Sequence, residues 1–408
     1  MTRDESRVGI VGCAMFILAY PAVVASGLLI APLMALAAMI ITPLRLESWT
    51  RIRWPWVTIP AGLFLVWASL SFLWSPHENP QQIPKLLGGV PLYALFAFRV
   101  GSQTGGWRAR IEASLIFFVF AACLFFFFEA MTDGSGTYAF KAGAEGLDGS
   151  ARDVRFSVNR SLGHGVAPLL LIAGPAILLS WKKGGPLLGG ILVGMVLLAS
   201  LSFDMQVNTV GMLLGVIGMG LARFFPRQML AITFGGLAGT ILAMPLLLPN
   251  LVGLIPEDMR TALPDSWAWR LETWTFATDL ISRSPWIGHG LDASRHISEI
   301  SVIQGVEVNN QPFAVELMPL HPHNAALHVW LETGLVGAGL LAIALIGLGE
   351  RLNAAKSLTQ FQAMAIIWVV WVYASLLLFS YGAWQEWHQG AVALATTAIL
   401  LLHSGKSV

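Results

Sequence analysis

This chain carries little charge for its length. Only 12% of its 408 residues are Asp, Glu, Lys or Arg, about half the share found in ordinary soluble proteins. Its formal net charge of +1 gives no sign of a basic surface for nucleic acid. Hydrophobic residues make up 56% of the sequence instead, with 16 Trp and 22 Phe. The composition therefore excludes a typical soluble domain and predicts no nucleic-acid partner.

Cysteine and nucleotide-binding motifs are also scarce. The two cysteines, Cys13 and Cys123, both fall inside apolar runs, where cysteine usually packs as a small hydrophobic residue. We therefore predict no disulfide and no metal site from them. The sequence has no Walker-type phosphate loop, and its Gly pairs at 189–190 and 235–236 lie inside apolar segments. We predict no cofactor.

Long apolar runs extend over the whole chain. Runs of about 17 to 25 residues can cross roughly 30 Å of hydrocarbon as helices, and they lack the alternation of membrane β-barrel strands. The run after Arg3 and Arg7 resembles a signal peptide but continues past Ala25, so we expect it to remain as membrane helices. The sequence therefore predicts an all-α, polytopic membrane protein with about twelve spans, at 8–22, 24–43, 57–74, 84–99, 111–130, 165–181, 186–202, 207–223, 228–249, 325–349, 361–380 and 387–403.

The distribution of Lys and Arg predicts the orientation of these spans. Fifteen cations fall in the tails and short connections assigned to the cytoplasm, whereas the short external connections contain only Lys85. This bias predicts that both termini are cytoplasmic. The fifteen are Arg3, Arg7, Arg45, Arg51, Arg53, Arg99, Arg108, Arg110, Lys182, Lys183, Arg223, Arg227, Arg351, Lys356 and Lys406.

Two long external segments interrupt the series of spans. Residues 1–249 would contain nine spans and, near 131–164, a flap rich in Gly, Ser and charge. Residues 250–324 would form an external subdomain, and residues 325–408 the last three spans. Within the subdomain, Pro264-Asp265-Ser266 predicts a helix start and Ser284-Pro285 its end. We expect an amphipathic helix along the membrane surface between them.

The string HPHN at 321–324 contains the strongest candidates for chemistry. Pro322 cannot lie inside the following helix and Asn324 is a suitable N-cap, so the string predicts the external end of the next span. His323 is the candidate catalytic base, because the ordinary pKa of histidine is about 6.5. His321 and Asn324 would bind substrate beside it. The alternatives are a capped helix whose histidines contact headgroups or water, and a zinc site of His321, His323 and His328.

His328 and Glu332 are four residues apart in that span, so they share a helix face. One interpretation is a buried hydrogen-bonded pair that fixes helix packing, and the other is a proton relay or cavity lining. We assign both a supporting role.

The two long segments contain seven arginines, and six of them are compared as possible ligands for an anion. A guanidinium binds phosphate bidentately and stays charged at any relevant pH, so external arginines at bilayer height would suit a lipid-linked phosphate or diphosphate. We favour Arg160, Arg270 and Arg295 for this role. Solvated loop charge or headgroup contact is the alternative, and we favour it for the other three, Arg152, Arg155 and Arg283.

Two short external turns are also polar. One holds Asp204, Gln206 and Asn208 before the span at 207–223, and the other lies at 381–388 before the last span. Tyr and Trp in the second turn could act as interfacial anchors or as stacking surfaces for sugars.

Three blocks of this sequence resemble the O-antigen ligase and polymerase superfamily of membrane glycosyltransferases. HPHNAALHVWLETGLVG is similar to the family's HN…L…E.G.G signature. WRLETWTFATDLISRSPWIGHGLDASR resembles its R…W…P..G.G loop block, and SVNRSLGHGVAPLLLIAGP resembles an NR-containing helix start. With the similar topology, the resemblance covers essentially the whole chain.

The resemblance implies transfer of a polysaccharide from undecaprenyl diphosphate to lipid A-core at the periplasmic face of the bacterial inner membrane, without a metal. By motif position, His323 would assist the acceptor hydroxyl and Arg270 would hold the diphosphate. Many members carry a Ser-Arg pair where this chain reads LSFDMQVNTVG, with no Arg or Lys from 184 to 222. Gln206 stands near that place, in a supporting role, and Arg160 becomes the better candidate for the diphosphate.

Three other functions compete with an O-antigen ligase. A polymerase of the same superfamily would use another lipid-linked repeat as its acceptor. A polysaccharide transporter would carry charge deep in several spans and show internal pseudo-symmetry, whereas charge here gathers on one face and no repeat is present. A scaffold without catalysis would leave the HPHN string and the arginines without a role.

Overall fold

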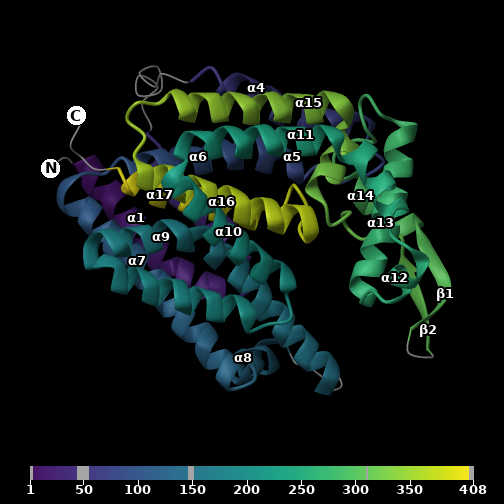
Figure 1. Ribbon diagram of the computed structural model, residues 1–408, viewed down its shortest axis with the longest axis horizontal. Coiled ribbons are helices and arrows are strands. Elements are labelled where there is room, and N and C mark those ends of the chain that lie inside the picture. The colour runs from purple at the N-terminus through teal and green to yellow at the C-terminus, as the bar shows by residue number, and fades with distance from the viewer. Residues whose placement is uncertain (1–2, 44–54, 146–150, 309–310, 404–408) are drawn as a thin grey trace.

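The computed structural model of the chain describes residues 3–43, 55–145, 151–308 and 311–403, and helices make up nearly all of it (Figure 1). The predicted all-α class is confirmed, with one short β-hairpin added. The elements are α1 (Arg3–Val24), α2 (Ile30–Ile41), α4 (Thr58–Leu70), the 3-10 turn η1 (Ser71–Trp74), α5 (Gln82–Pro84), the π-helical turn η2 (Lys85–Gly89), α6 (Val90–Gly101), α7 (Gly105–Met131), α8 (Ser135–Glu145), α9 (Ala151–Leu201), α10 (Gln206–Phe224), α11 (Pro226–Gly253), α12 (Glu257–Thr261), α13 (Asp265–Arg283), α14 (Ala293–Ile300), β1 (Val302–Val308), β2 (Gln311–Glu316), α15 (Ala325–Ala354), α16 (Gln360–Phe379) and α17 (Glu386–Leu401).

Eight helices in the described part of the chain are long and apolar enough to cross a membrane, and Ile30–Ile41 and Thr58–Trp74 are shorter apolar helices. One of the eight, α9, contains two of the predicted spans because Gly185 (φ 78°, ψ −176°) breaks it. Asn208 donates to the Gly163 carbonyl at 2.8 Å, so the chain after Gly185 runs back to the level of residue 163. Each predicted span overlaps a helix, while the number that cross the bilayer stays a prediction.

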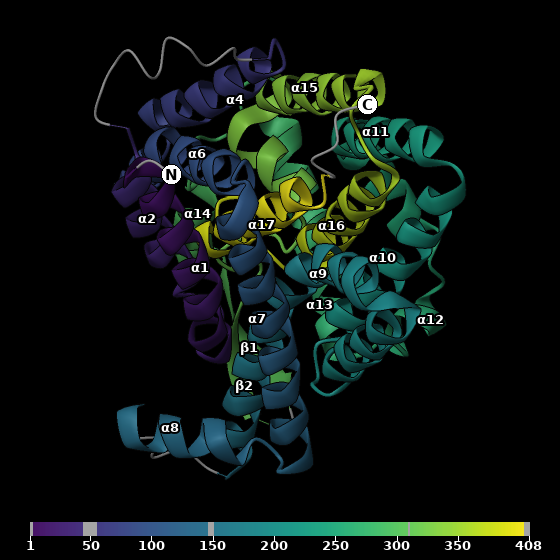
Figure 2. The same ribbon diagram turned by 90° about the vertical axis from the view of Figure 1, so that its left-hand side faces the viewer.

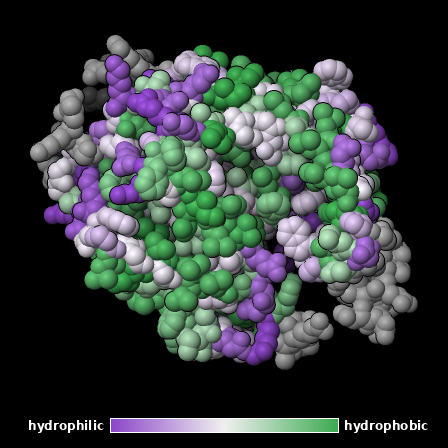
Figure 3. All heavy atoms as spheres, viewed as in Figure 1, coloured by the Kyte–Doolittle hydropathy of each residue, from purple (hydrophilic) through white to green (hydrophobic). Residues whose placement is uncertain are grey.

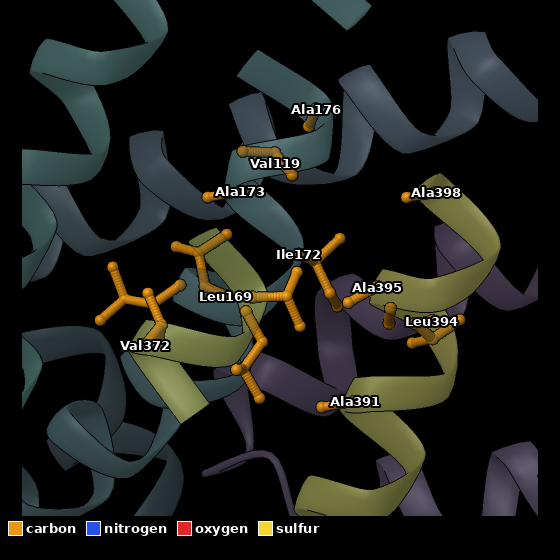
Figure 4. Packing of buried hydrophobic residues seen from close by; sticks show 14 of the residues in the cluster. Val119, Leu169, Ile172, Ala173, Ala176, Val372, Ala391, Leu394, Ala395 and Ala398 are labelled. Atoms are coloured by element: carbon orange, nitrogen blue, oxygen red, sulfur yellow. The ribbon is translucent and has the colours of Figure 1, made fainter. Parts of the chain in front are cut away.

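Small residues allow these helices to pack closely, as is usual where lipid provides no hydrophobic driving force. A Cβ atom on Gly174 of α9 would lie 2.2 Å from the ring of Trp368 on α16. The Trp368 indole donates to the Leu170 carbonyl at 2.8 Å, which satisfies its one polar atom. Figure 4 shows the adjoining contact between α9 and α17, where three large side chains lie next to five alanines: Leu169, Ile172, Ala173, Ala176, Ala391, Leu394, Ala395 and Ala398.

The two ends of the molecule are built from different elements. The start of α1 and the end of α17 lie together, while α12, α13, α14 and the hairpin lie at the opposite end (Figure 1). At the first end, Arg99 of α6 forms an ion pair with Asp4, and Arg108 of α7 donates to the carbonyls of Leu401 and His403. Hydrophilic residues gather toward both ends, with a largely hydrophobic surface between them (Figure 3). Of the cations used for the orientation, Arg45, Arg51, Arg53 and Lys406 lie outside the described residues.

Both long segments are mainly helical. In the segment 131–164, α8 lies beyond the end of α7, at the lower edge of the molecule (Figure 2), and α9 begins at Ala151 and continues into the core. The segment 250–324 contains α12, α13, α14 and the antiparallel β1–β2 hairpin. The helix predicted between Pro264 and Ser284 is confirmed as α13, with these two residues as its caps. The structure does not test whether α13 lies along a membrane surface.

Candidate functional site

A polar cavity opens between the start of α9, the start of α10 and α13. Its volume is about 1220 Å³, including the open mouth. Two loops complete its wall, at 316–323 before α15 and at 380–385 between α16 and α17. The lining residues are Phe156, Asn159, Arg160, His164, Asp204, Met205, Arg270, Glu316, Pro319, Leu320, His321, His323, Ser380, Tyr381 and Gln385.

Local structure explains how the HPHN string presents its histidines. The Trp274 indole of α13 donates to the Pro322 carbonyl at 2.8 Å, which ties the string to the external subdomain. His323 then adopts a left-handed backbone conformation (φ 52°), which costs a non-glycine residue about 1–2 kcal/mol. Asn324 is the N-cap of α15, and its side chain accepts from the Leu327 amide at 3.1 Å. The cap predicted for this helix is confirmed, and His323 is turned toward the cavity.

His323 has a defined tautomer. Its Nδ1 lies 2.5 Å from the Ser380 carbonyl, and a carbonyl only accepts, so Nδ1 carries the proton. In the neutral ring Nε2 therefore keeps its lone pair, and no described residue donates to it. Burial lowers the pKa of His323, and the charges of Arg270 and Arg160 lower it further, against the raising effect of the Ser380 carbonyl. His323 is a neutral ring that can accept a proton at Nε2.

Arg270 is held in place by two main-chain carbonyls. Its Nε donates to the Phe379 carbonyl at 3.1 Å, and its Nη1 to the Ser266 carbonyl at 2.7 Å. The guanidinium lies 5.5 Å from the centre of the Trp267 ring. Burial lowers the pKa of Arg270, although a guanidinium stays charged near neutral pH. No described carboxylate forms an ion pair with it, so its positive charge is available to the cavity.

Arg160 projects from α9 into the same cavity. Its side chain is exposed, and it has no ion pair among the described residues. The two acids in the lining are engaged elsewhere, because Asp204 accepts from Asn159 at 3.3 Å and Glu316 accepts from Ser298 at 3.0 Å. Two unneutralised guanidinium groups beside a histidine form a site suited to an anion.

His321 lies next to His323, with ring centroids 4.6 Å apart. Its Nδ1 accepts from the His323 amide at 3.3 Å, so the proton of the neutral ring is on Nε2. The amide nitrogen of Gln385 lies 3.3 Å from that Nε2, and an exchange of the two amide atoms would bring the Gln385 oxygen there to accept the proton. Burial and then the charge of His323 lower the pKa of His321 well below its ordinary value. His321 is therefore a neutral polar wall of the cavity.

His328 and Glu332 lie behind the cavity and do not line it. His328 accepts from the Ala383 amide at Nδ1 (3.1 Å), so its Nε2 donates to Glu332 at 3.0 Å. Glu332 is fully buried, and its carboxylate accepts from five groups: the amides of Asp292 and Ser294, the Ser294 hydroxyl, His328 and the Trp384 indole. The geometry favours the interpretation that this pair fixes packing.

A break in α15 holds the segment 250–324 against this helix. Gly334 (φ 62°, ψ −164°) interrupts the helix, and a Cβ there would lie 2.4 Å from the Trp286 carbonyl group. The freed carbonyls of Leu331 and Glu332 accept from the amides of His289 and Gly290, at 2.8 and 2.9 Å. Past the break, the amide of Leu335 donates to the Pro285 carbonyl at 2.8 Å. The loop at 285–290 therefore pairs its backbone with the interrupted helix.

The structure brings together four of the residues predicted for the site, namely His321, His323, Arg160 and Arg270. The other five lie outside the lining. Asn324 is occupied as a helix cap, and Arg295 pairs with Asp292 at 3.2 Å. Gln206 accepts from the Trp267 indole at 3.5 Å and so links α10 to α13. Substrate-binding roles for Asn324 and Arg295 therefore have no support from the geometry.

The remaining arginines lie apart from the cavity lining. Arg155 forms an ion pair with Asp133, and Arg283 with Asp279 at 2.6 Å. Both are exposed, which agrees with solvated loop charge. The side chain of Arg152 lies outside the described residues.

Sequence reasoning overlooked His164 and Phe156 as site residues. Phe156, Arg160 and His164 follow one another at intervals of four on α9, so they share one face. That spacing was a usable signal once Arg160 was a candidate. The roles of Ser380 and Phe379 had no signal, because they act through their main-chain carbonyls.

The histidines do not form a zinc triad. Both ring nitrogens of His328 already have partners, and Nδ1 of His323 faces a carbonyl. Within the described ranges, no three His, Cys, Asp or Glu side chains are grouped as metal ligands.

The fold and the site define a multi-pass helical membrane protein whose loops enclose a cavity suited to an anionic ligand. The O-antigen ligase family matches residues 160–342, a range that contains both cavity arginines and the HPHN string. Similar proteins carry the name "Putative polysaccharide ligase". One from Rickettsia conorii is 28% identical over 349 residues, covering 83% of this chain and 78% of its own. One from Rickettsia typhi is 26% identical over 332 residues, covering 80% and 75%.

By these matches, the chain is similar to the O-antigen ligase family over residues 160–342 and to polysaccharide ligases over most of its length. A third relative, from Rickettsia felis, is 29% identical over 288 residues, which covers 69% of this chain and 65% of its own. No solved structure matches the chain. The family match and the names of these relatives support a ligase-like function.

Proposed function

We propose that this protein transfers a glycan from undecaprenyl diphosphate to lipid A-core, as an O-antigen ligase. The observation that supports this most directly is the arrangement around Ser380: His323 donates from Nδ1 to that carbonyl, and its free Nε2 shares a cavity with Arg160 and Arg270. A base beside two unpaired guanidinium groups fits an activated sugar whose leaving group is a diphosphate.

The reaction needs no external energy source, because the diphosphate-linked sugar is already activated. The acceptor hydroxyl oxygen attacks the anomeric carbon, and the bond from that carbon to the diphosphate oxygen breaks. The hydroxyl proton moves to Nε2 of His323, and the negative charge that develops on the diphosphate is stabilised by Arg160 and Arg270. A cavity that holds both substrates also lowers the entropic barrier to their meeting.

We assign the cavity to the periplasmic face of the inner membrane, with both termini in the cytoplasm. The distribution of Lys and Arg in short connections supports this orientation. The cavity lies among the starts of α9, α10 and α13, at the end of the molecule opposite to the start of α1 (Figure 1). A lipid-linked donor and a lipid-linked acceptor would both reach it from the external leaflet.

Reconstitution in proteoliposomes tests this proposal. Purified protein is supplied with an undecaprenyl-diphosphate-linked glycan and lipid A-core, and products are separated by gel and mass. We expect glycan covalently attached to the core. Lengthened lipid-linked chains with unmodified core would identify a polymerase instead, and the absence of any new glycosidic bond would refute both.

A further inference from the structure

One buried residue of the cavity lining, Tyr381, has a polar group without a partner in the described part of the chain. Tyr381 lies in the loop between α16 and α17. It is only 2% exposed, yet it lines the cavity. Its hydroxyl has no hydrogen-bond partner among the described residues. A buried hydroxyl without a partner is costly, and natural proteins usually satisfy such groups. Tyr381 is thus a rigid donor in need of an acceptor.

The ring of Tyr381 is held firmly in place. It packs edge-on against Trp387, with centroids 4.9 Å apart, and against His164 at 5.4 Å. The hydroxyl therefore cannot turn away to another partner without disturbing two aromatic contacts.

Two further groups on α9 face the same region. His164 lies one helical turn after Arg160, so both project from the same face of α9. Both line the cavity, and neither forms an ion pair within the described part of the chain. Asp204, the acid on this side, accepts from Asn159 and makes no ion pair with Arg160. A phenol, an imidazole and a guanidinium thus line one side of the cavity, and no described carboxylate forms an ion pair with the guanidinium.

We propose that Tyr381, His164 and Arg160 form a phosphate subsite that binds one of the two phosphates of the donor diphosphate, while Arg270 faces the other. This inference rests on the proposed function. The Tyr381 hydroxyl donates to a phosphate oxygen, and Arg160 supplies the charge. The subsite selects a diphosphate over a monophosphate, because only the longer anion reaches both Arg270 and Tyr381.

Binding measurements on the full-length protein test the subsite. Undecaprenyl diphosphate and undecaprenyl monophosphate are titrated in nanodiscs, and inorganic pyrophosphate is titrated in buffer to separate the anion from its lipid. Tyr381→Phe should weaken undecaprenyl diphosphate about 10- to 150-fold, the usual range for a hydrogen bond to a charged group. Its affinity for the monophosphate should be almost unchanged, and His164→Ala should follow the same pattern.

Thermal unfolding separates this role from a structural one. Tyr381→Phe removes an unpaired buried hydroxyl, so without ligand it should be at least as stable as the wild type. Its stabilisation by undecaprenyl diphosphate should be smaller than that of the wild type. Tyr138→Phe is the matched control, because Tyr138 is exposed on α8 and does not line the cavity.

Each outcome decides the matter. A lower stability of ligand-free Tyr381→Phe would show that the hydroxyl has a structural role, and the subsite would be wrong. Normal diphosphate binding by Tyr381→Phe, with weak binding by Arg160→Gln and Arg270→Gln, would overturn the subsite alone. Failure of the wild type to bind any diphosphate would overturn the proposed function as well.

Discussion

At the scale of single residues, two adjacent main-chain carbonyls organise the centre. The Phe379 carbonyl accepts from Arg270, and the Ser380 carbonyl accepts from His323. Both belong to the C-terminal end of α16, where the helix dipole favours positive charge. The carbonyl of Ser380 selects the Nδ1–H tautomer, so the end of one helix orients the proposed base and fixes one arginine.

Substitution of His323 by Ala should lower glycan transfer by about 10²- to 10⁴-fold, the usual contribution of general acid–base catalysis. The measurement is product formation in the proteoliposome assay, with expression and thermal stability recorded alongside. His296→Ala is the control, because His296 lies on α14 outside the cavity lining. Transfer at the normal rate by His323→Ala would remove His323 from the mechanism.

The pH dependence of transfer should reflect the environment of His323. Burial, Arg270 and Arg160 lower the pKa of His323 from its ordinary value of 6.5. The neutral ring is the active form, so kcat/KM should stay high down to pH values below 6.5 and fall as pH drops through the lowered pKa. Loss of one charge in Arg160→Gln should raise the pKa and move this fall to higher pH.

Arg283→Gln is the control for the pH profile, since Arg283 is exposed and paired with Asp279. If the fall of kcat/KM at low pH occurs at the same pH in Arg160→Gln as in the wild type, that fall reflects the protonation of a group other than His323.

Metal chelation provides a test of the zinc alternative. Because Nδ1 of His323 faces a carbonyl and both nitrogens of His328 have partners, we expect transfer to survive in EDTA. Loss of activity in EDTA, with recovery on adding Zn²⁺, would contradict this expectation.

Sequence patterns identified His323 and Arg270, since motif spacing and the chemistry of the proposed reaction both indicated them. They also led to Asn324 and Arg295 as ligands, although the first caps a helix and the second pairs with Asp292. A side chain that caps or pairs locally looks the same in sequence as one that binds substrate. The contributions of Phe379 and Ser380 have no side-chain signature at all.

At the scale of elements, the break in α15 is the feature that connects this helix to the loop at 285–290. Backbone groups without partners are very costly within a bilayer. Around Gly334 the freed carbonyls and amides are paired with the loop at 285–290, and Trp67 donates to the Thr333 carbonyl at 2.9 Å. The hydrogen-bond network of Glu332 lies directly beside this break, so the two together join the segment 250–324 to α15.

Gly334→Ala should destabilise the protein by about 2 kcal/mol or more, because alanine disfavours the left-handed conformation and its Cβ would collide with Trp286. Thermal unfolding in detergent measures this effect. Gly339→Ala is the matched control further along α15, where a Cβ meets open space. It should be neutral or stabilise by about 0.5–1 kcal/mol. Equal stability of the two variants would show that the break is not needed.

Hydrophobic length allowed the long helices to be predicted, and the signals at Pro264 and Ser284 allowed the bounds of α13 to be predicted. Hydrophobic length could not predict that Gly334 interrupts α15, since glycine is common in membrane helices and a break depends on a distant loop. Similarly, low hydrophobicity and many Gly and Ser residues predicted a flap near 131–164, whereas α8 and the first turns of α9 occupy most of it.

At the scale of the whole molecule, the ion pairs of Arg99, Arg108 and Lys183 lie at one end and the cavity lies at the other. One end ties helix termini together through Arg99, Arg108 and Lys183, the last paired with Glu112 at 2.7 Å. The opposite end contains α12, α13, α14 and the β-hairpin (Figure 1), and residues of α13 and of the loop before α15 line the cavity. This separation is expected when one end faces the cytoplasm and the other faces the substrates.

Cysteine labelling tests the orientation. In a variant without Cys13 and Cys123, Ser282→Cys on α13 should react with a membrane-impermeant maleimide in intact spheroplasts. Ser102→Cys, at the end of α6, should react only after permeabilisation, because both serines are exposed but lie at opposite ends. The reverse pattern would invert the proposed topology.

The adjacent carbonyls at 379 and 380 also bear on how glycan preference can diverge. A peptide unit is rigid and planar. The short backbone between the carbonyls of Phe379 and Ser380 therefore limits the distance between Arg270 and His323, which these carbonyls bind. Substitutions of the cavity-lining residues near 316–320 do not alter this backbone segment. Substitutions in that part of the wall are therefore expected to change which glycan binds, while the spacing of Arg270 and His323 stays the same.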